Sequence, residues 1–139
     1  MKLLPWVALA VFFSVPAPVR AAAPADMPPN MERYYVVLLK RPANAPKLEE
    51  SALEALQKQH LAHLRAMYEA GKLVLAGPFD EQRDEALRGM CLYRVASAEE
   101  ARTLADADPA VKAGRLTVEV LAWWVAKGAV TFKPAPAQK

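Results

Sequence analysis

The chain has 139 residues, 54% hydrophobic and 24% charged, so it is long enough for one packed domain and too apolar to be disordered throughout. Its formal charge of +3 comes from 18 basic and 15 acidic residues, and no run of Lys or Arg concentrates it. Composition therefore gives no basis for a nucleic-acid partner or for attachment to a membrane surface.

Residues 1–21 have the features of a signal peptide. Lys2 provides a positive start, an apolar stretch spans residues 3–15, and small residues surround Ala21. The stretch is shorter than the roughly 20 apolar residues that a membrane-spanning helix needs. We therefore expect cleavage after Ala21 and a periplasmic or secreted protein with no membrane attachment. A buried N-terminal helix or an uncleaved anchor is the alternative.

The rest of the chain divides into an extended tether (residues 22–30), one folded domain (31–130) and a flexible C-terminal tail (131–139). Prolines and a lack of apolar periodicity mark both end segments. The one cysteine, Cys91, cannot form an intramolecular disulfide, so the domain must be held by its hydrophobic core. Because Cys91 lies in a strand-like run, we expect it to be a small buried residue.

The first half of the domain predicts a strand, a helix and two further strands. Residues 34–39 are aromatic and β-branched, and residues 49–70 carry apolar side chains every three or four positions before Gly71. Strands are expected at 73–76, closed by Gly77-Pro78, and at 90–95.

The second half predicts a helix, a short helical turn and a last strand. Ser97 and Glu100 have the spacing of a capping box, so the helix should begin there and run through Leu104. Pro109 is well suited to begin the turn that ends at Gly114, and residues 118–125 form the last strand. The order βαββαβ predicts an α+β, ferredoxin-like fold: an antiparallel four-stranded sheet with both helices on one face.

This arrangement leaves one face of the sheet without a cover. Three of the strands are apolar at nearly every position, whereas the solvated face of a sheet should alternate with polar residues. A homodimer packing sheet against sheet, as in a dimeric α/β barrel, would bury that face. We expect Tyr35, Val37, Trp123 or Trp124 at or near the shared face; a covering N-terminal tether is the alternative.

Both histidines, His60 and His63, lie on the first predicted helix. His60 falls within its apolar stripe and His63 toward the edge. A core histidine satisfied by a backbone carbonyl is the alternative to a functional one. The i, i+3 spacing could hold a metal, but no carboxylate motif accompanies it, and no Gly-rich phosphate loop is present. We therefore predict neither a metal nor another cofactor.

Two further motifs have structural as well as functional interpretations. Asp108 precedes Pro109 and can be the N-cap of the short helical turn, while Asp106 can be a solvated helix end. Gly77-Pro78 at a strand end is ordinary turn chemistry.

Taken together, these motifs resemble the YCII-like family over about residues 34–124. His60 stands eleven places before Gly71, a strand then ends in Ala76-Gly77-Pro78, and Ala107-Asp108-Pro109 is closely followed by Lys112-Ala113-Gly114. The resemblance implies a ferredoxin-like domain that dimerises through its sheets, with His60 and Asp108 in the active site. The family often has an arginine three residues before this histidine, where the chain has Gln57. We therefore do not assign a substrate of the family to this chain.

Two functions remain open. The first is an enzyme, a lyase or isomerase, in which His60 moves a proton on a small carbonyl-containing or halogenated compound while Asp108 orients it. The second is a non-catalytic module that binds a small molecule. In both cases we expect His60 and Asp108 to face one cleft, with Gly77, Pro78 and the loop after the first strand in its wall.

Overall fold

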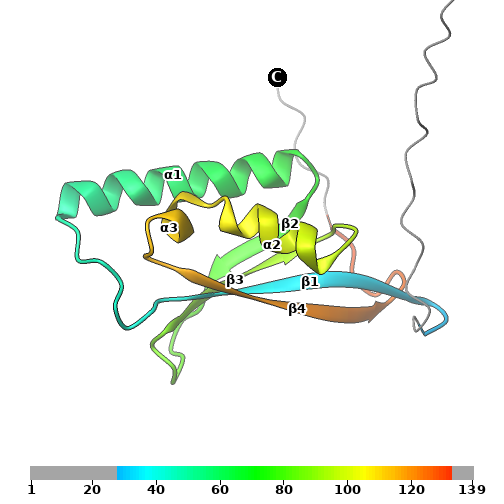
Figure 1. The fold of residues 1–139 in the computed structure, drawn as a ribbon. Helices are drawn as coiled ribbons and strands as arrows, with labels where there is room; N and C mark the ends of the chain where they lie inside the picture. The colour runs from blue at the N-terminus through cyan, green and yellow to red at the C-terminus, as the bar shows by residue number, and fades with distance from the viewer. Residues whose placement is uncertain (1–27, 133–139) are drawn as a thin grey trace, which may run out of the picture.

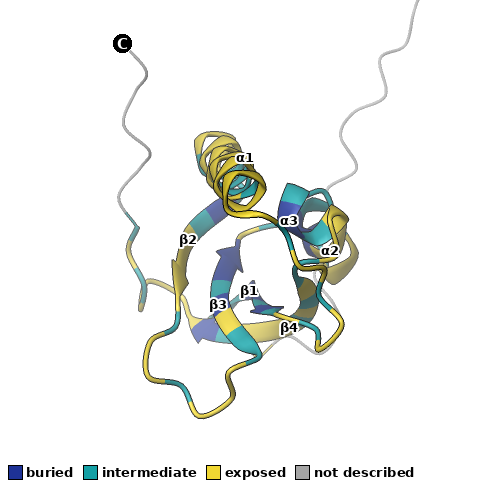
Figure 2. Ribbon diagram, turned by 90° about the vertical axis from the view of Figure 1, so that its left-hand side faces the viewer, coloured by how far each residue is buried: buried dark blue, intermediate teal, exposed yellow. Residues whose placement is uncertain are grey.

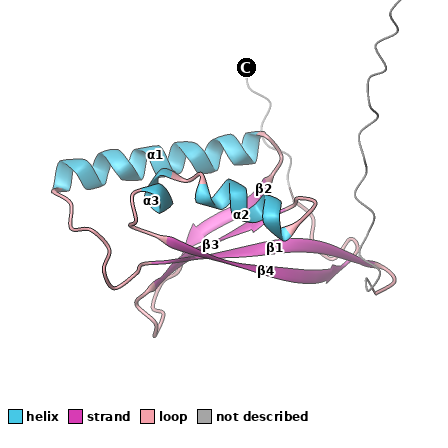
Figure 3. Cartoon of the chain, in the orientation of Figure 1, coloured by secondary structure: helices cyan, strands magenta, loops and turns pink. Residues whose placement is uncertain are grey.

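The computed structural model describes residues 28–132; the predicted signal peptide, most of the tether and most of the tail lie outside this range. The described elements are, in chain order, β1 (Met31–Lys40), α1 (Glu50–Glu69), β2 (Leu73–Pro78), β3 (Leu87–Tyr93), α2 (Ala98–Asp106), α3 (Pro109–Lys112) and β4 (Thr117–Ala126). The strands form one antiparallel sheet in the order β2-β3-β1-β4, and the helices lie over one of its faces (Figure 1 and Figure 3). The predicted ferredoxin-like α+β fold is therefore confirmed.

The hairpin between β2 and β3 extends further than the sequence predicted. β2 continues through Gly77 and Pro78, and β3 begins at Leu87. Proline is tolerated here because β2 is an edge strand of the sheet. At Gly89, opposite Pro78, an added Cβ would lie 2.5 Å from the Gly77 carbonyl oxygen, so this close approach of the two strands requires glycine.

The core lies between the helices and the covered face of the sheet. Tyr35, Val37 and Tyr93 are almost fully buried there, and α2 approaches closely through the small side chains of Ala101 and Ala105. This placement corrects one expectation. Because Tyr35 and Val37 point toward the helices, they cannot lie on a face shared with a second sheet.

The opposite, open face carries the apolar patch that the strand pattern predicted. Leu121 and Trp123 pair with Val36 and Tyr34 across β4 and β1 and are 43% and 45% exposed. Figure 2 shows the exposed stretches of β4. Part of the face is covered from the C-terminal side, because Phe132 packs edge-on against Tyr34 with ring centres 5.8 Å apart. The packed structure thus reaches beyond residue 130.

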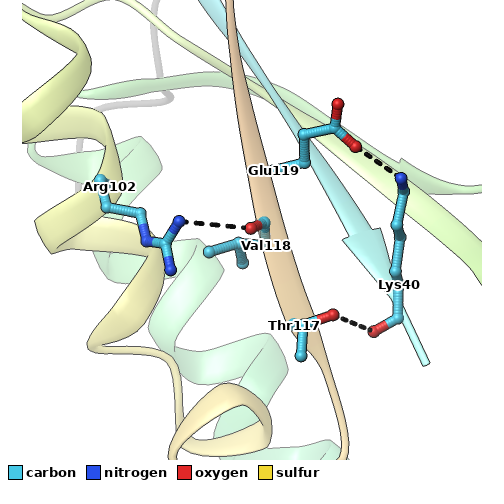
Figure 4. A network of polar contacts seen from close by, with 5 residues as sticks. All are labelled: Lys40, Arg102, Thr117, Val118 and Glu119. Carbon is cyan, nitrogen blue, oxygen red and sulfur yellow. Dashed lines mark hydrogen bonds and ion pairs between the residues drawn. The ribbon is translucent and has the colours of Figure 1, made fainter. Parts of the chain in front are cut away.

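Polar contacts hold the edge strand β4 against strand β1 and helix α2, as Figure 4 shows. Arg102 of α2 donates to the Val118 carbonyl oxygen at 3.4 Å, and Thr117 donates to the Lys40 carbonyl oxygen at 3.3 Å. Lys40 also pairs with Glu119 on the open face. Among residues 28–132, no helix is long and apolar enough to cross a membrane.

Candidate active site

The C-terminal half of helix α1 packs against the core, and its N-terminal half lines a pocket. Leu64, Met67 and Tyr68, toward its C-terminal end, pack against the core. Toward its N-terminal end, Leu53 and Leu56 line a pocket of about 1030 Å³ between the helix and the sheet. The apolar stripe predicted from the sequence is therefore partly a pocket wall, and no residue of α1 is fully buried.

His60 lies in the middle of α1, where the pocket meets the core. Its Nδ1 atom is 2.7 Å from Oδ2 of Asp108, and its side chain is only 12% exposed. The structure thus brings together the histidine and the aspartate that the sequence singled out, 48 residues apart along the chain.

Asp108 is held in place by the backbone around it. It is the N-cap of α3, and its Oδ1 atom accepts a hydrogen bond of 2.8 Å from the Ala110 N–H. Pro109, which has no N–H to satisfy, occupies the first helical position. The capping interpretation is therefore right, and it coexists with the contact to His60, because each carboxylate oxygen serves a different partner.

The arrangement determines which nitrogen of His60 carries the proton. An ionised carboxylate only accepts hydrogen bonds, so the Nδ1 atom beside Asp108 must be the donor. In the neutral ring the Nε2 atom then has a free lone pair, and it has no hydrogen-bond partner among residues 28–132. This tautomer is suited to accepting a proton from a ligand in the pocket.

His63 has a different environment. Its Nε2 atom is 3.1 Å from the Leu104 carbonyl oxygen, which allows it to donate a hydrogen bond that ties α1 to α2. A histidine satisfied by a backbone carbonyl was the structural alternative considered for this helix, and it describes His63.

The remaining walls agree with the geometry expected from the sequence. Gly77 and Pro78 at the end of β2 line the pocket, and so does Arg41 in the segment after β1. Cys91 also lines it but is 2% exposed, and burial, with the nearby Asp108 charge, raises the pKa of its thiol to about 12. Such a thiol stays protonated and unreactive at neutral pH. The part of the chain described here has no group of three or more His, Cys, Asp or Glu side chains placed to hold a metal.

Sequence reasoning missed the positively charged part of the pocket. Arg41, Arg88 and Arg115 all line it, although they belong to three separate segments. No local spacing connects positions 41, 88 and 115, so only the folded arrangement of the strands indicates that they share one cavity.

Comparison with known proteins places the chain in a family. A solved structure of 5-chloro-2-hydroxyhydroquinone dehydrochlorinase from Burkholderia phenoliruptrix, in complex with 2,5-dihydroxybenzoquinone, is similar with 21% identity and a TM-score of 0.47, covering 65% of this chain and 92% of that one. No curated protein matches the chain. The model of the YCII-related domain matches residues 33–124, which carry His60, Asp108, all of β2 and β3 and most of β1 and β4. The chain is a member of the YCII-related domain family.

Proposed function

We propose that this protein is a cofactor-independent acid–base enzyme, a lyase or isomerase, that acts on a small carbonyl-containing or halogenated compound. His60 is the proton acceptor and donor. Asp108 positions the imidazole and stabilises its charged form. The observation that carries the proposal is the 2.7 Å contact between His60 Nδ1 and Asp108 Oδ2, which leaves Nε2 as the available base in the pocket. Gly77 and Pro78 form the wall of the ligand site on the side of the sheet.

The proposed step is the removal of a proton from carbon. Nε2 accepts the proton, and the electron pair of the C–H bond moves toward the neighbouring carbonyl oxygen, or expels a halide in an elimination. The imidazolium that forms is stabilised by the Asp108 carboxylate and can return the proton to another carbon of the same molecule. The neutral and charged forms of the ring both fit this role, because Nδ1 donates to Asp108 in each.

The test measures proton transfer without knowledge of the full reaction. A panel of small ketones, lactones and chlorinated carbonyl compounds is incubated with the protein in D₂O, and C–H to C–D exchange is followed by NMR. We expect at least one compound to exchange faster with the wild type and to lose this acceleration in His60→Gln. His63→Gln is the matched control and should retain it. The proposal is wrong if no compound exchanges faster with the wild type than with His60→Gln.

A second candidate is a non-catalytic module that binds a small molecule in the same pocket. The observation that favours it is Gln57, which lines the pocket where family members often have an arginine. Binding of a panel compound by calorimetry, with no His60-dependent exchange of that compound or any other, would select this function.

We also propose that the protein works outside the cytoplasm, with cleavage after Ala21. The support is the sequence of residues 1–21, which lie outside the described part of the structure. Mass spectrometry of the protein expressed in a bacterial host tests this proposal. An intact Met1 on soluble cytoplasmic material contradicts it, and a mature N-terminus near Ala22 in the periplasmic or culture fraction supports it.

A further inference from the structure

Three arginines meet at the pocket that contains His60. Arg41 follows β1, Arg88 lies in β3, and Arg115 lies between α3 and β4. Backbone contacts bring these segments together, since the Arg41 N–H donates to the Ala86 carbonyl oxygen just before β3 at 2.7 Å. The side chain of Arg115 is steadied by a 2.6 Å hydrogen bond to the Pro46 carbonyl oxygen.

None of the three guanidinium groups has a counter-ion among residues 28–132. No carboxylate forms an ion pair with any of them, and the side chains of Arg41 and Arg88 have no hydrogen-bond partner in this part of the chain. Arg41 is exposed, but partial desolvation, and then the charges of Arg88 and Arg115, lower its pKa. Like charges gathered without compensation disfavour folding, which makes the cluster a candidate for binding rather than for stability.

The other lining residues determine what kind of anion fits. Helix α1 contributes one further cation, Lys58, and the single carboxylate of the lining, Glu54, so positive charge is in excess. Most of the remaining wall is apolar: Leu39, Leu53, Leu56, Leu61, Leu64, Met90 and Leu116. A pocket with an apolar body and a few convergent charged groups is typical of a site for an organic ion.

We propose that the pocket binds an organic carboxylate, with its carboxylate group held by Arg41, Arg88 and Arg115 and its apolar body lying along α1 toward His60. Guanidinium groups bind carboxylates through paired, charge-assisted hydrogen bonds. The inference rests on the proposed function in one respect, that this pocket is the ligand site, and it names the class of ligand.

The test compares acids with their neutral amides. Benzoate, cinnamate and 2-naphthoate, each beside the corresponding amide, are titrated into the full protein by calorimetry at low salt. We expect at least one acid to bind about tenfold more tightly than its amide, which corresponds to one charge-assisted hydrogen bond. The double variant Arg41→Gln/Arg88→Gln should lose this preference. Arg65→Gln removes an exposed arginine of α1 outside the pocket and should keep it.

A second readout separates binding from a structural role. If the arginines hold the fold together, the double variant unfolds at a lower temperature than the wild type. If they are instead gathered to bind a ligand, the melting temperature of the double variant is unchanged or higher, because the substitutions relieve the repulsion between like charges. The proposal is overturned if no acid binds more tightly than its amide, or if the double variant keeps the preference. His60→Gln distinguishes the two proposals, since carboxylate binding should survive in that variant even if proton transfer is never detected.

Discussion

Asp108 shows how one side chain can satisfy a structural and a chemical requirement together. Its Oδ1 atom caps α3 through the Ala110 N–H, and its Oδ2 atom holds Nδ1 of His60. The hydrogen bond from the Ala110 N–H restrains rotation of the carboxylate, so the imidazole is oriented by a group that is itself held in place. Capping aspartates are common, and the second contact is what distinguishes this one.

Replacing Asp108 by Asn should therefore change the tautomer of His60. The Asn oxygen should keep the bond from the Ala110 N–H, which turns the NH₂ group toward Nδ1 and forces the ring proton onto Nε2. We expect ¹⁵N NMR to report this switch, and His60-dependent exchange to fall by roughly 10²–10⁴-fold, the contribution usual for general acid–base catalysis.

Asp106→Asn is the matched control for this experiment. Asp106 ends α2 and accepts a 2.8 Å hydrogen bond from Arg102 at its exposed surface. Its replacement should leave the His60 tautomer and the exchange rate unchanged. An unaltered His60 tautomer in Asp108→Asn would show that Asp108 does not set the proton position.

At the scale of elements, the start of α2 is held by a cap and an ion pair. The Ser97 hydroxyl accepts from the Glu100 N–H at 3.0 Å, as the capping-box spacing predicted. The Glu100 carboxylate, however, accepts from the Ala96 N–H and from Lys72 Nζ at 2.6 Å, so it links α2 to the turn before β2. The Lys72 ammonium, and then the Ala96 N–H, hold the pKa of Glu100 below its usual value.

Glu100→Gln should lose stability in a pH-dependent manner. Because the pKa of Glu100 is lower in the folded than in the unfolded chain, its contribution is present above the unfolded value of 4.5 and is lost as pH falls through the folded value. We expect a cost of up to about 1 kcal/mol at pH 7, typical of a partly exposed ion pair. Urea unfolding at pH 7 and pH 3 measures it, and the difference from wild type should disappear at pH 3.

Glu99→Gln provides the control, because Glu99 is an exposed neighbour in the same helical turn. It has no ion-pair partner among residues 28–132 and should show little cost at either pH. An equal loss in Glu100→Gln at pH 7 and pH 3 would assign the effect to packing instead of charge.

At the scale of the whole molecule, the open face of the sheet is only partly covered by residues 28–132. Leu121 and Trp123 are exposed there beside Val36, and the Lys40–Glu119 pair lies at the edge of this patch. Trp124, by contrast, is opposite Arg33 on the helix side, with the guanidinium 5.3 Å from its ring centre. Of the four residues expected at a shared face, only Trp123 is placed to lie there.

We propose that two copies pack these open faces together, and that Trp123→Lys disrupts the dimer. A lysine at the centre of an apolar interface would be buried without a counter-ion, which is costly. Light scattering at micromolar concentration should give a dimer for the wild type and a monomer or aggregate for the variant. Leu61→Lys also places a charge on an exposed leucine, but on α1, and should remain dimeric. A monomeric wild type contradicts the proposal.

The sequence alone determined the order of the elements and the fold class, which follow from local information: hydrophobic period, capping spacing and turn residues. The pair His60–Asp108 is 48 residues apart and was expected only from the resemblance to the YCII-like family. The ends of β2 and β3 were less accurate, because Gly89 and Pro78 look like turn residues until the close approach of the strands is known.

Only the tertiary structure decided which residues share a face or a cavity. The side of the sheet on which Tyr35 lies depends on strand register, and a shift of one residue would reverse it. The division of α1 between core and pocket depends on how the helix lies over the sheet. The gathering of Arg41, Arg88 and Arg115 depends on strand order, since three charges on separate segments become neighbours only when β1, β3 and β4 are placed side by side.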